Sequence, residues 1–136
     1  MKTVLSFGTF DLFHPGHEDF LRQGKALGDR LVVVVARDAT VSEVKGRAPE
    51  QSETARLERV KACPSVDEAR LGSLDDKYAV VEDIRPDVIL LGYDQEAFVD
   101  RLEESLRERG LSATIERAKS FHPELYKTSH LRNDRL

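Results

Sequence analysis

The uninterrupted apolar run Leu31-Val32-Val33-Val34-Val35-Ala36 constrains the fold of this chain more strongly than any other stretch. The run is rich in β-branched residues and lacks the alternation of apolar and polar residues that marks a strand with one face in water. It is typical of a parallel strand that is covered on both faces. The sequence therefore predicts a sheet that lies between two layers of helices.

The rest of the chain alternates further strands with helices. Strands are also predicted at residues 4–7, 66–71, 88–92 and 112–117, and helices at 15–27, 52–62, 78–84 and 101–109. Residues 37–50 show no apolar periodicity, and we expect a long surface loop there. This order predicts an α/β fold of the Rossmann-like type, a five-stranded parallel sheet with helices on both faces, in a single domain over residues 1–136. In such sheets ligands bind beyond the carboxyl ends of the strands, where Gly8 and Gly92 lie.

Composition and charge restrict the partners of the chain. The formal net charge of −4 argues against a nucleic-acid partner, because binding of phosphate backbones relies on clustered Lys and Arg. The longest apolar run is far shorter than the ~18 residues that a membrane span needs, and we recognise no secretion signal. Cys63 is the only cysteine, which suits a reducing compartment. We therefore expect a cytoplasmic protein without a membrane partner.

The segment Gly8-Thr9-Phe10-Asp11-Leu12-Phe13-His14-Pro15-Gly16-His17 joins the first predicted strand to the first predicted helix. His14 and His17 are three residues apart across the start of that helix, so both imidazoles can face one ligand. The helix N-terminus adds free N–H groups and the positive end of the helix dipole, while Gly8 and Gly16 allow close approach of the backbone. These features predict a phosphate-binding site. No Ser-His-Asp or Cys-His arrangement is evident, which disfavours acyl transfer.

The same ten residues resemble the signature of the cytidylyltransferase-like nucleotidyltransferases, in which His14, Gly16 and His17 match the motif His-x-Gly-His. The resemblance extends through nearly the whole chain, since other family segments follow in the expected order: Ala36-Arg37-Asp38, Lys45-Gly46-Arg47-Ala48-Pro49 and Leu91-Gly92-Tyr93-Asp94-Gln95. Within this superfamily the chain is most similar to the archaeal-type FAD synthases. Those enzymes transfer AMP from ATP to FMN.

The resemblance implies a reaction in which a substrate phosphate attacks the α-phosphorus in line and pyrophosphate leaves, so that the protein mainly positions charges. His14 and His17 would bind the triphosphate and stabilise the transition state, and Lys45 would reach a phosphate as a point charge. Mg²⁺ or another divalent cation would arrive with the nucleotide, and no side chain is assigned as a metal ligand. The implied nucleotide-binding residues are Gly8, Thr9, Phe10, Asp11, Gly16, Asp38, Gly92, Tyr93, Asp94, Lys127, Thr128 and Ser129.

Three of these assignments stay open at the level of sequence. Asp11 orients the histidine loop, lies near Mg²⁺ or is an Asx-type turn residue. Asp38 accepts a hydrogen bond from a ribose hydroxyl, or it is a solvated loop residue or a helix N-cap. Relatives that use CTP often carry Arg-Thr-x-Gly-Ile-Ser-Thr near the C-terminus, whereas this chain has Tyr126-Lys127-Thr128-Ser129. Lys127 and Arg132 are the candidates to replace that arginine.

Two other functions are compatible with the same residues. A cytidylyltransferase that uses CTP and glycerol 3-phosphate, or a similar phosphorylated alcohol, would employ the same histidines. A nucleotide-binding sensor would keep the fold without turnover, although a pure binder needs no paired donors for a transition state. The family resemblance also admits a homodimer. The leading hypothesis is an ATP:FMN adenylyltransferase whose partners are these small molecules.

Overall fold

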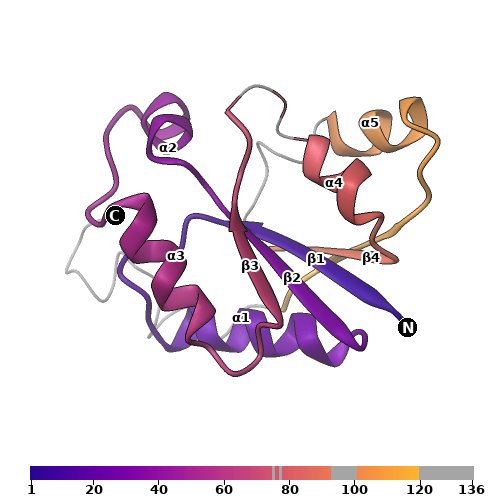
Figure 1. The fold of residues 1–136 in the computed structure, drawn as a ribbon, viewed down its shortest axis with the longest axis horizontal. Helices are drawn as coiled ribbons and strands as arrows, with labels where there is room; N and C mark the ends of the chain where they lie inside the picture. The colour runs from indigo at the N-terminus through magenta and orange to yellow at the C-terminus, as the bar shows by residue number, and fades with distance from the viewer. Residues whose placement is uncertain (75, 77, 93–100, 120–136) are drawn as a thin grey trace.

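The computed structural model describes residues 1–74, 76, 78–92 and 101–119. They form a five-stranded parallel sheet in the order β3-β2-β1-β4-β5 (Figure 1). The strands are β1 Thr3–Gly8, β2 Arg30–Val35, β3 Glu68–Leu71, β4 Val88–Leu91 and β5 Thr114–Arg117. The helices are α1 Pro15–Ala26, α2 Asp38–Lys45, α3 Glu53–Lys61, α4 Ala79–Ile84 and α5 Leu102–Glu108. The predicted Rossmann-like α/β fold is confirmed.

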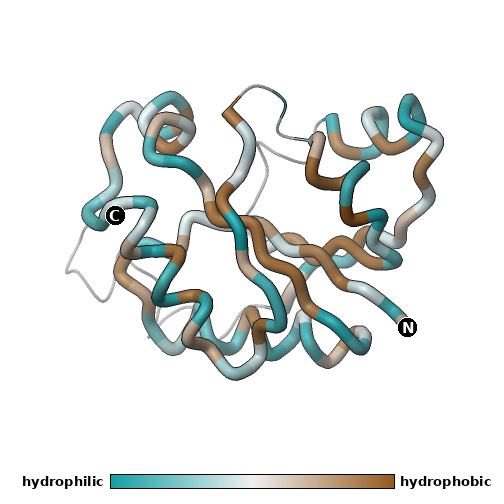
Figure 2. The backbone as a smooth tube through the Cα atoms, in the orientation of Figure 1, coloured by the Kyte–Doolittle hydropathy of each residue, from teal (hydrophilic) through white to brown (hydrophobic). Residues whose placement is uncertain are grey.

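Two layers of apolar side chains cover the two faces of the sheet. On one face, Val33 of β2 packs with Leu21 of α1 and Val60 of α3. On the other face, Val32 packs with Val81 of α4 and Leu106 of α5. Figure 2 shows hydrophobic residues along the central strands, as the run at β2 predicts. Alternate valines of that run therefore enter different cores, which is why the sequence there is apolar without interruption.

The strand order reverses beside β1. From β1 the chain continues to β2 and β3 on one side, and then returns to place β4 and β5 on the other side. Gly8 at the end of β1 pairs with Val35 of β2, while Ser6 pairs with Leu90 of β4. The carboxyl ends of β1 and β4 consequently lie at the point where open α/β sheets bind ligands.

The prediction of a loop over residues 37–50 is wrong in its first half, because residues 38–45 form α2. The helix has no apolar stripe that a sequence pattern could reveal, since Val41 is its buried residue and Val44 is 64% exposed. Gly46 ends the helix in the left-handed conformation, with φ of 78°.

Small differences also occur at the sheet edge and the helix ends. β3 begins at Glu68 rather than at Val66, because Val66 donates its N–H to the Cys63 carbonyl in the turn after α3. The helix predicted over residues 52–62 begins at Glu53, and the Ser52 hydroxyl caps it by accepting from the Ala55 N–H at 3.1 Å. Among the described residues, no helix is long and apolar enough to span a bilayer.

Candidate active site

The loop between β1 and α1 has a strained backbone. Phe10 and Leu12 adopt left-handed conformations with φ of 56° and 53°, which cost non-glycine residues on the order of 1–3 kcal/mol each. The Phe10 ring is buried and lies over Gly8, where an added Cβ would come within 2.6 Å of Phe10 Cε2. The strand must therefore end in glycine for the loop to close over it. Such strain persists only where surrounding contacts hold the backbone in place.

His14 and His17 fix one another at the start of α1. The His14 N–H donates to Nδ1 of His17 at 3.2 Å, and the Gly16 N–H donates to Nδ1 of His14 at 3.0 Å. The two rings stack with their centroids 4.0 Å apart. Because each Nδ1 accepts a hydrogen bond, the proton of each neutral ring is on Nε2. The helix start thus presents two Nε2–H donors together, as the spacing of the histidines predicts.

Both imidazoles are held in the neutral form. Burial lowers the pKa of His17 to about 3, and the charges of His14 and Lys45 act in the same direction. Burial also lowers the pKa of His14. Phe10 and Phe13 pack against His17, with ring centroids 5.5 and 5.3 Å away. At neutral pH each ring can therefore act as a hydrogen-bond donor but not as a cation.

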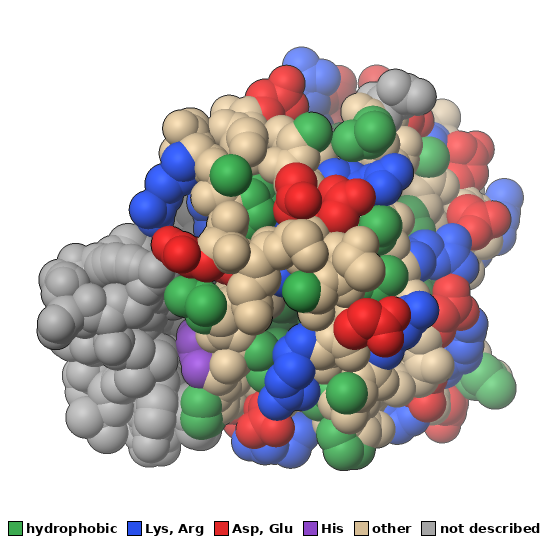
Figure 3. Space-filling view, turned by 60° about the vertical axis from the view of Figure 1, so that its left-hand side comes forward, with side chains coloured by type: hydrophobic (Ala, Val, Ile, Leu, Met, Phe, Trp, Pro, Cys, Tyr) green, Lys and Arg blue, Asp and Glu red, His purple; other side chains and the backbone are tan. Residues whose placement is uncertain are grey.

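A histidine side chain reaches the surface among hydrophobic side chains in the space-filling view (Figure 3). The charge of Lys45 is one of the causes that lower the pKa of His17, so these two predicted residues act on one another electrostatically. The position of Lys45 differs from the prediction in one respect, since it is the last residue of α2 and not part of a long surface loop.

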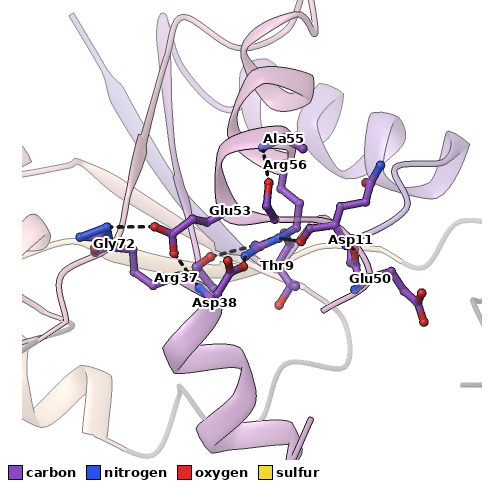
Figure 4. Close-up of polar contacts among 12 residues, drawn as sticks. Thr9, Asp11, Arg37, Asp38, Glu50, Glu53, Ala55, Arg56 and Gly72 are labelled. Atoms are coloured by element: carbon purple, nitrogen blue, oxygen red, sulfur yellow. Dashed lines mark hydrogen bonds and ion pairs between the residues drawn. The ribbon is translucent and has the colours of Figure 1, made fainter. Parts of the chain in front are cut away.

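Asp11 contacts the segment that leads into α3, and Thr9 contacts α3 itself (Figure 4). The Asp11 carboxylate accepts the Glu50 N–H at 2.7 Å and the Gln51 N–H at 2.9 Å. The Thr9 carbonyl accepts from the Arg56 guanidinium at 2.9 Å. Asp11 therefore joins two distant stretches of chain, which excludes the Asx-turn interpretation in which it bonds within its own turn.

The most buried polar group of the site is Arg56, which the sequence analysis did not single out. Its side chain has no exposed surface, and it donates to the carbonyls of Thr9, Ala36 and Gln51 and to the Asp38 carboxylate at 2.6 Å. One signal for it exists in the sequence, because Arg56 is four residues before Val60 and so lies on the buried face of α3.

Asp38 forms an ion pair with Arg56 within the protein. Its hydrogen bond to Arg56 lowers the pKa of Asp38, so the carboxylate is ionised at neutral pH. Arg37 occupies the N-cap position of α2, and Asp38 is the first helical residue, so the N-cap alternative for Asp38 is wrong. A hydrogen bond from a ribose hydroxyl to Asp38 stays a prediction.

At the carboxyl end of β4, the Gly92 carbonyl accepts from Arg117 Nη1 at 2.9 Å, which ties the ends of β4 and β5 together. The other predicted residues beyond β4 and near the C-terminus lie outside the described residues: Tyr93, Asp94, Gln95, Lys127, Thr128, Ser129 and Arg132. Within the described part of the chain, no group of three or more His, Cys, Asp or Glu side chains is placed to hold a metal ion.

The sequence model of the cytidylyltransferase-like family matches residues 5–134, nearly the full length of the chain. The chain belongs to the cytidylyltransferase-like family. Within that family it is 47% identical to the FAD synthase of Aciduliprofundum boonei over 121 residues, covering 89% of this chain and 80% of that protein. It is 50% identical to the FAD synthase of Methanosarcina acetivorans over 118 residues, covering 86% of this chain and 76% of that protein. The predicted similarity to archaeal-type FAD synthases is confirmed.

Solved structures agree with the cytidylyltransferase-like fold. A lipopolysaccharide core biosynthesis protein from Thermoplasma volcanium is 38% identical, with a TM-score of 0.82, and the match covers 89% of this chain and 98% of that one. Pantoate-beta-alanine ligase from Francisella tularensis has a TM-score of 0.67 at 14% identity, over 97% of this chain and 65% of that one. The second likeness concerns the fold alone.

Proposed function

We propose that this chain is an ATP:FMN adenylyltransferase, which forms FAD and pyrophosphate. The observation that carries the proposal is the stacked pair of neutral imidazoles at the N-terminus of α1, each with Nε2–H as its donor. That pair occurs in a chain that is 47–50% identical to FAD synthases over most of its length. Donors of this kind suit a substrate whose negative charge is spread over several phosphate oxygens.

In the proposed reaction an oxygen of the FMN phosphate attacks the α-phosphorus of ATP. The new P–O bond forms as the bond from the α-phosphorus to the bridging oxygen of the β-phosphate breaks, and that electron pair leaves with pyrophosphate. The Nε2–H groups of His14 and His17 donate to phosphate oxygens as negative charge develops, and the positive end of the α1 dipole acts alongside them. The backbone N–H groups of Gly16 and His17 are not free for this task, because both donate to His14. The Lys45 ammonium supplies the positive charge.

A divalent cation, Mg²⁺ in the simplest case, would neutralise part of the triphosphate charge. The described side chains fit a cation that the nucleotide itself carries, because both oxygens of Asp11 already accept backbone N–H groups. The oxygens of the triphosphate would then supply most of the ligands. We also propose that the enzyme is one nucleotidyltransferase domain that acts in the cytoplasm, while homodimerisation stays a prediction from the family resemblance.

An assay with purified protein separates the adenylyltransferase from its alternatives. ATP or CTP is offered with FMN or glycerol 3-phosphate, and both pyrophosphate and the organic product are measured. We expect FAD and pyrophosphate in equal amounts from ATP and FMN. Turnover with CTP and glycerol 3-phosphate instead would favour the cytidylyltransferase, and nucleotide binding without turnover in any pair would favour the sensor.

A further inference from the structure

Two loops from distant parts of the chain are joined by reciprocal hydrogen bonds at Asp11. Its two carboxylate oxygens accept the backbone N–H groups of Glu50 and Gln51, one each. In return, the Leu12 N–H donates to Oε1 of Gln51 at 3.2 Å. We call residues 46–52, which connect α2 to α3, the return segment. Three hydrogen bonds thus fasten the return segment to the strained loop that carries the histidines.

Arg56 makes a second attachment between the same two stretches of chain. Its Nε donates to the Gln51 carbonyl at 3.0 Å, and its Nη1 donates to the Thr9 carbonyl at 2.9 Å. The guanidinium is fully buried, so these bonds form in surroundings where water does not compete for the donors. The return segment is therefore attached both to the histidine loop and to α3 (Figure 4).

The N-terminal end of α2 is also attached to α3. The Asp38 carboxylate accepts from Arg56 Nη2 at 2.6 Å, and the Asp38 N–H donates to Glu53 Oε1 at 2.8 Å. The helix that begins at Asp38 and ends at Lys45 is consequently held at its start by α3, and the chain that leaves it is held by Asp11. Lys45 lies between these two attachments.

We propose that Asp11 is a positioning residue that fixes the end of α2, and with it Lys45, relative to the histidine loop, by fastening the return segment to that loop. The inference rests on the proposed function, because it assigns Asp11 a task in that reaction. It also selects one of the open interpretations of Asp11. Each oxygen of the Asp11 carboxylate accepts one backbone N–H group, which holds the carboxylate in the contact between the two loops and favours positioning over metal binding.

The inference predicts that Asp11→Asn acts through Lys45. An asparagine keeps one acceptor oxygen, but its NH₂ group faces a backbone N–H, so one of the two bonds is lost. We expect kcat to fall by about tenfold, because a point charge that is misplaced relative to the triphosphate stabilises the transition state less. The Mg²⁺ concentration that gives half-maximal rate should stay the same. A strong rise of that concentration, with full rate recovered at saturating Mg²⁺, would overturn the proposal in favour of metal binding.

A double variant tests the route through Lys45. In a Lys45→Ala background, Asp11→Asn should change kcat very little, since the group that it positions is already absent. If the two substitutions multiply their effects, Asp11 does not act through Lys45 and the proposal is wrong. Asp83→Asn is the matched control, because Asp83 is an exposed carboxylate that pairs with Arg70 and lies on α4, which packs on the other face of the sheet from α1. The kcat of this variant should equal that of the wild type.

Hydrogen exchange of backbone amides tests the attachment without any turnover. In Asp11→Asn we expect faster exchange at Glu50 and Gln51 and in the last turn of α2, with unchanged exchange in β2. Gln51→Ala removes only the hydrogen bond from Leu12, so exchange should become faster at the same amides but by a smaller factor. This variant replaces Asp11→Asn in the test if Asp11→Asn folds poorly. Unchanged exchange in the return segment would overturn the attachment. If the wild type makes no FAD, the proposed function fails, while this measurement still decides whether Asp11 holds the two loops together.

Discussion

His14 and His17 position one another, since the backbone N–H of His14 donates to Nδ1 of His17 at 3.2 Å and the two rings stack. This contact sets which nitrogen of His17 carries the proton. It also places the donor of His17 next to that of His14, so in the proposed reaction the two would act on one group of oxygens. The enzyme therefore requires little rearrangement of these donors when the transition state forms.

Replacing His17 should affect catalysis more than binding. In His17→Ala we expect kcat to fall by about 10²- to 10³-fold, the usual effect of removing one donor from developing negative charge. The dissociation constant of ATP should change much less, because the ground-state triphosphate keeps its other contacts. Steady-state kinetics and calorimetric titration measure the two quantities. Equal losses in both would mean that His17 binds substrate and transition state alike.

The low pKa of His17 predicts a pH dependence of stability. Its pKa is about 3 in the folded protein and 6.5 in an exposed histidine, so between these values the unfolded chain binds a proton that the folded protein does not. The free energy of unfolding should therefore fall as the pH drops from about 7 to about 5. Urea titrations at both pH values measure it, and His17→Asn should flatten the dependence. The carboxylates whose pKa values are lowered titrate below this window.

If instead the wild type and His17→Asn lose the same amount of stability between these pH values, His17 is not held neutral by the fold. The activity profile gives a second check. An enzyme that uses neutral donors should show no loss of kcat on the alkaline side of pH 6.5, where a catalytic imidazolium would lose its proton.

Gly8 should not tolerate a side chain. In Gly8→Ala the new Cβ would meet the Phe10 ring at 2.6 Å, and we expect a loss of about 1–3 kcal/mol in the free energy of unfolding, as for other overpacked sites. Gly72→Ala is the matched control, since a Cβ there is 3.4 Å from Val34 Cγ1, close to an ordinary contact. Urea unfolding compares the two. Similar stability of both variants would show that the Phe10 ring moves away at little cost.

Arg56 should be among the most sensitive positions for stability. Arg56→Ala leaves three carbonyls and the Asp38 carboxylate without their donor, and removing one partner of a buried ion pair costs about 3–5 kcal/mol. We expect the lower end, because Asp38 is 43% exposed and can regain water. Lys61→Ala, at an exposed position on α3, should change stability by less than about 0.5 kcal/mol. A loss as small as that for Arg56→Ala would contradict the role of Arg56.

The central architecture follows from local sequence patterns, whereas the supports of the site do not. The apolar run at β2 reports directly on burial, and the strand that it predicts is confirmed. Gly8 ends β1 under the Phe10 ring, while the approach of its backbone to a phosphate stays a prediction. No such pattern marks α2, because Val41 is the buried residue of this helix and a single buried residue makes no apolar stripe. Arg56 looks like a surface arginine in a charged helix, and its burial depends on acceptors that come from separate parts of the chain.

The fate of the ATP phosphates tests the proposed reaction most directly. The purified enzyme is incubated with FMN and ATP that carries ³²P at either the α- or the γ-phosphorus. The proposed reaction predicts that the α-label appears in FAD and the γ-label in pyrophosphate, because the α-phosphorus is the one that FMN attacks. A γ-label in the flavin product, or no labelled flavin with either form of ATP, would contradict the assignment of this chain as an FMN adenylyltransferase.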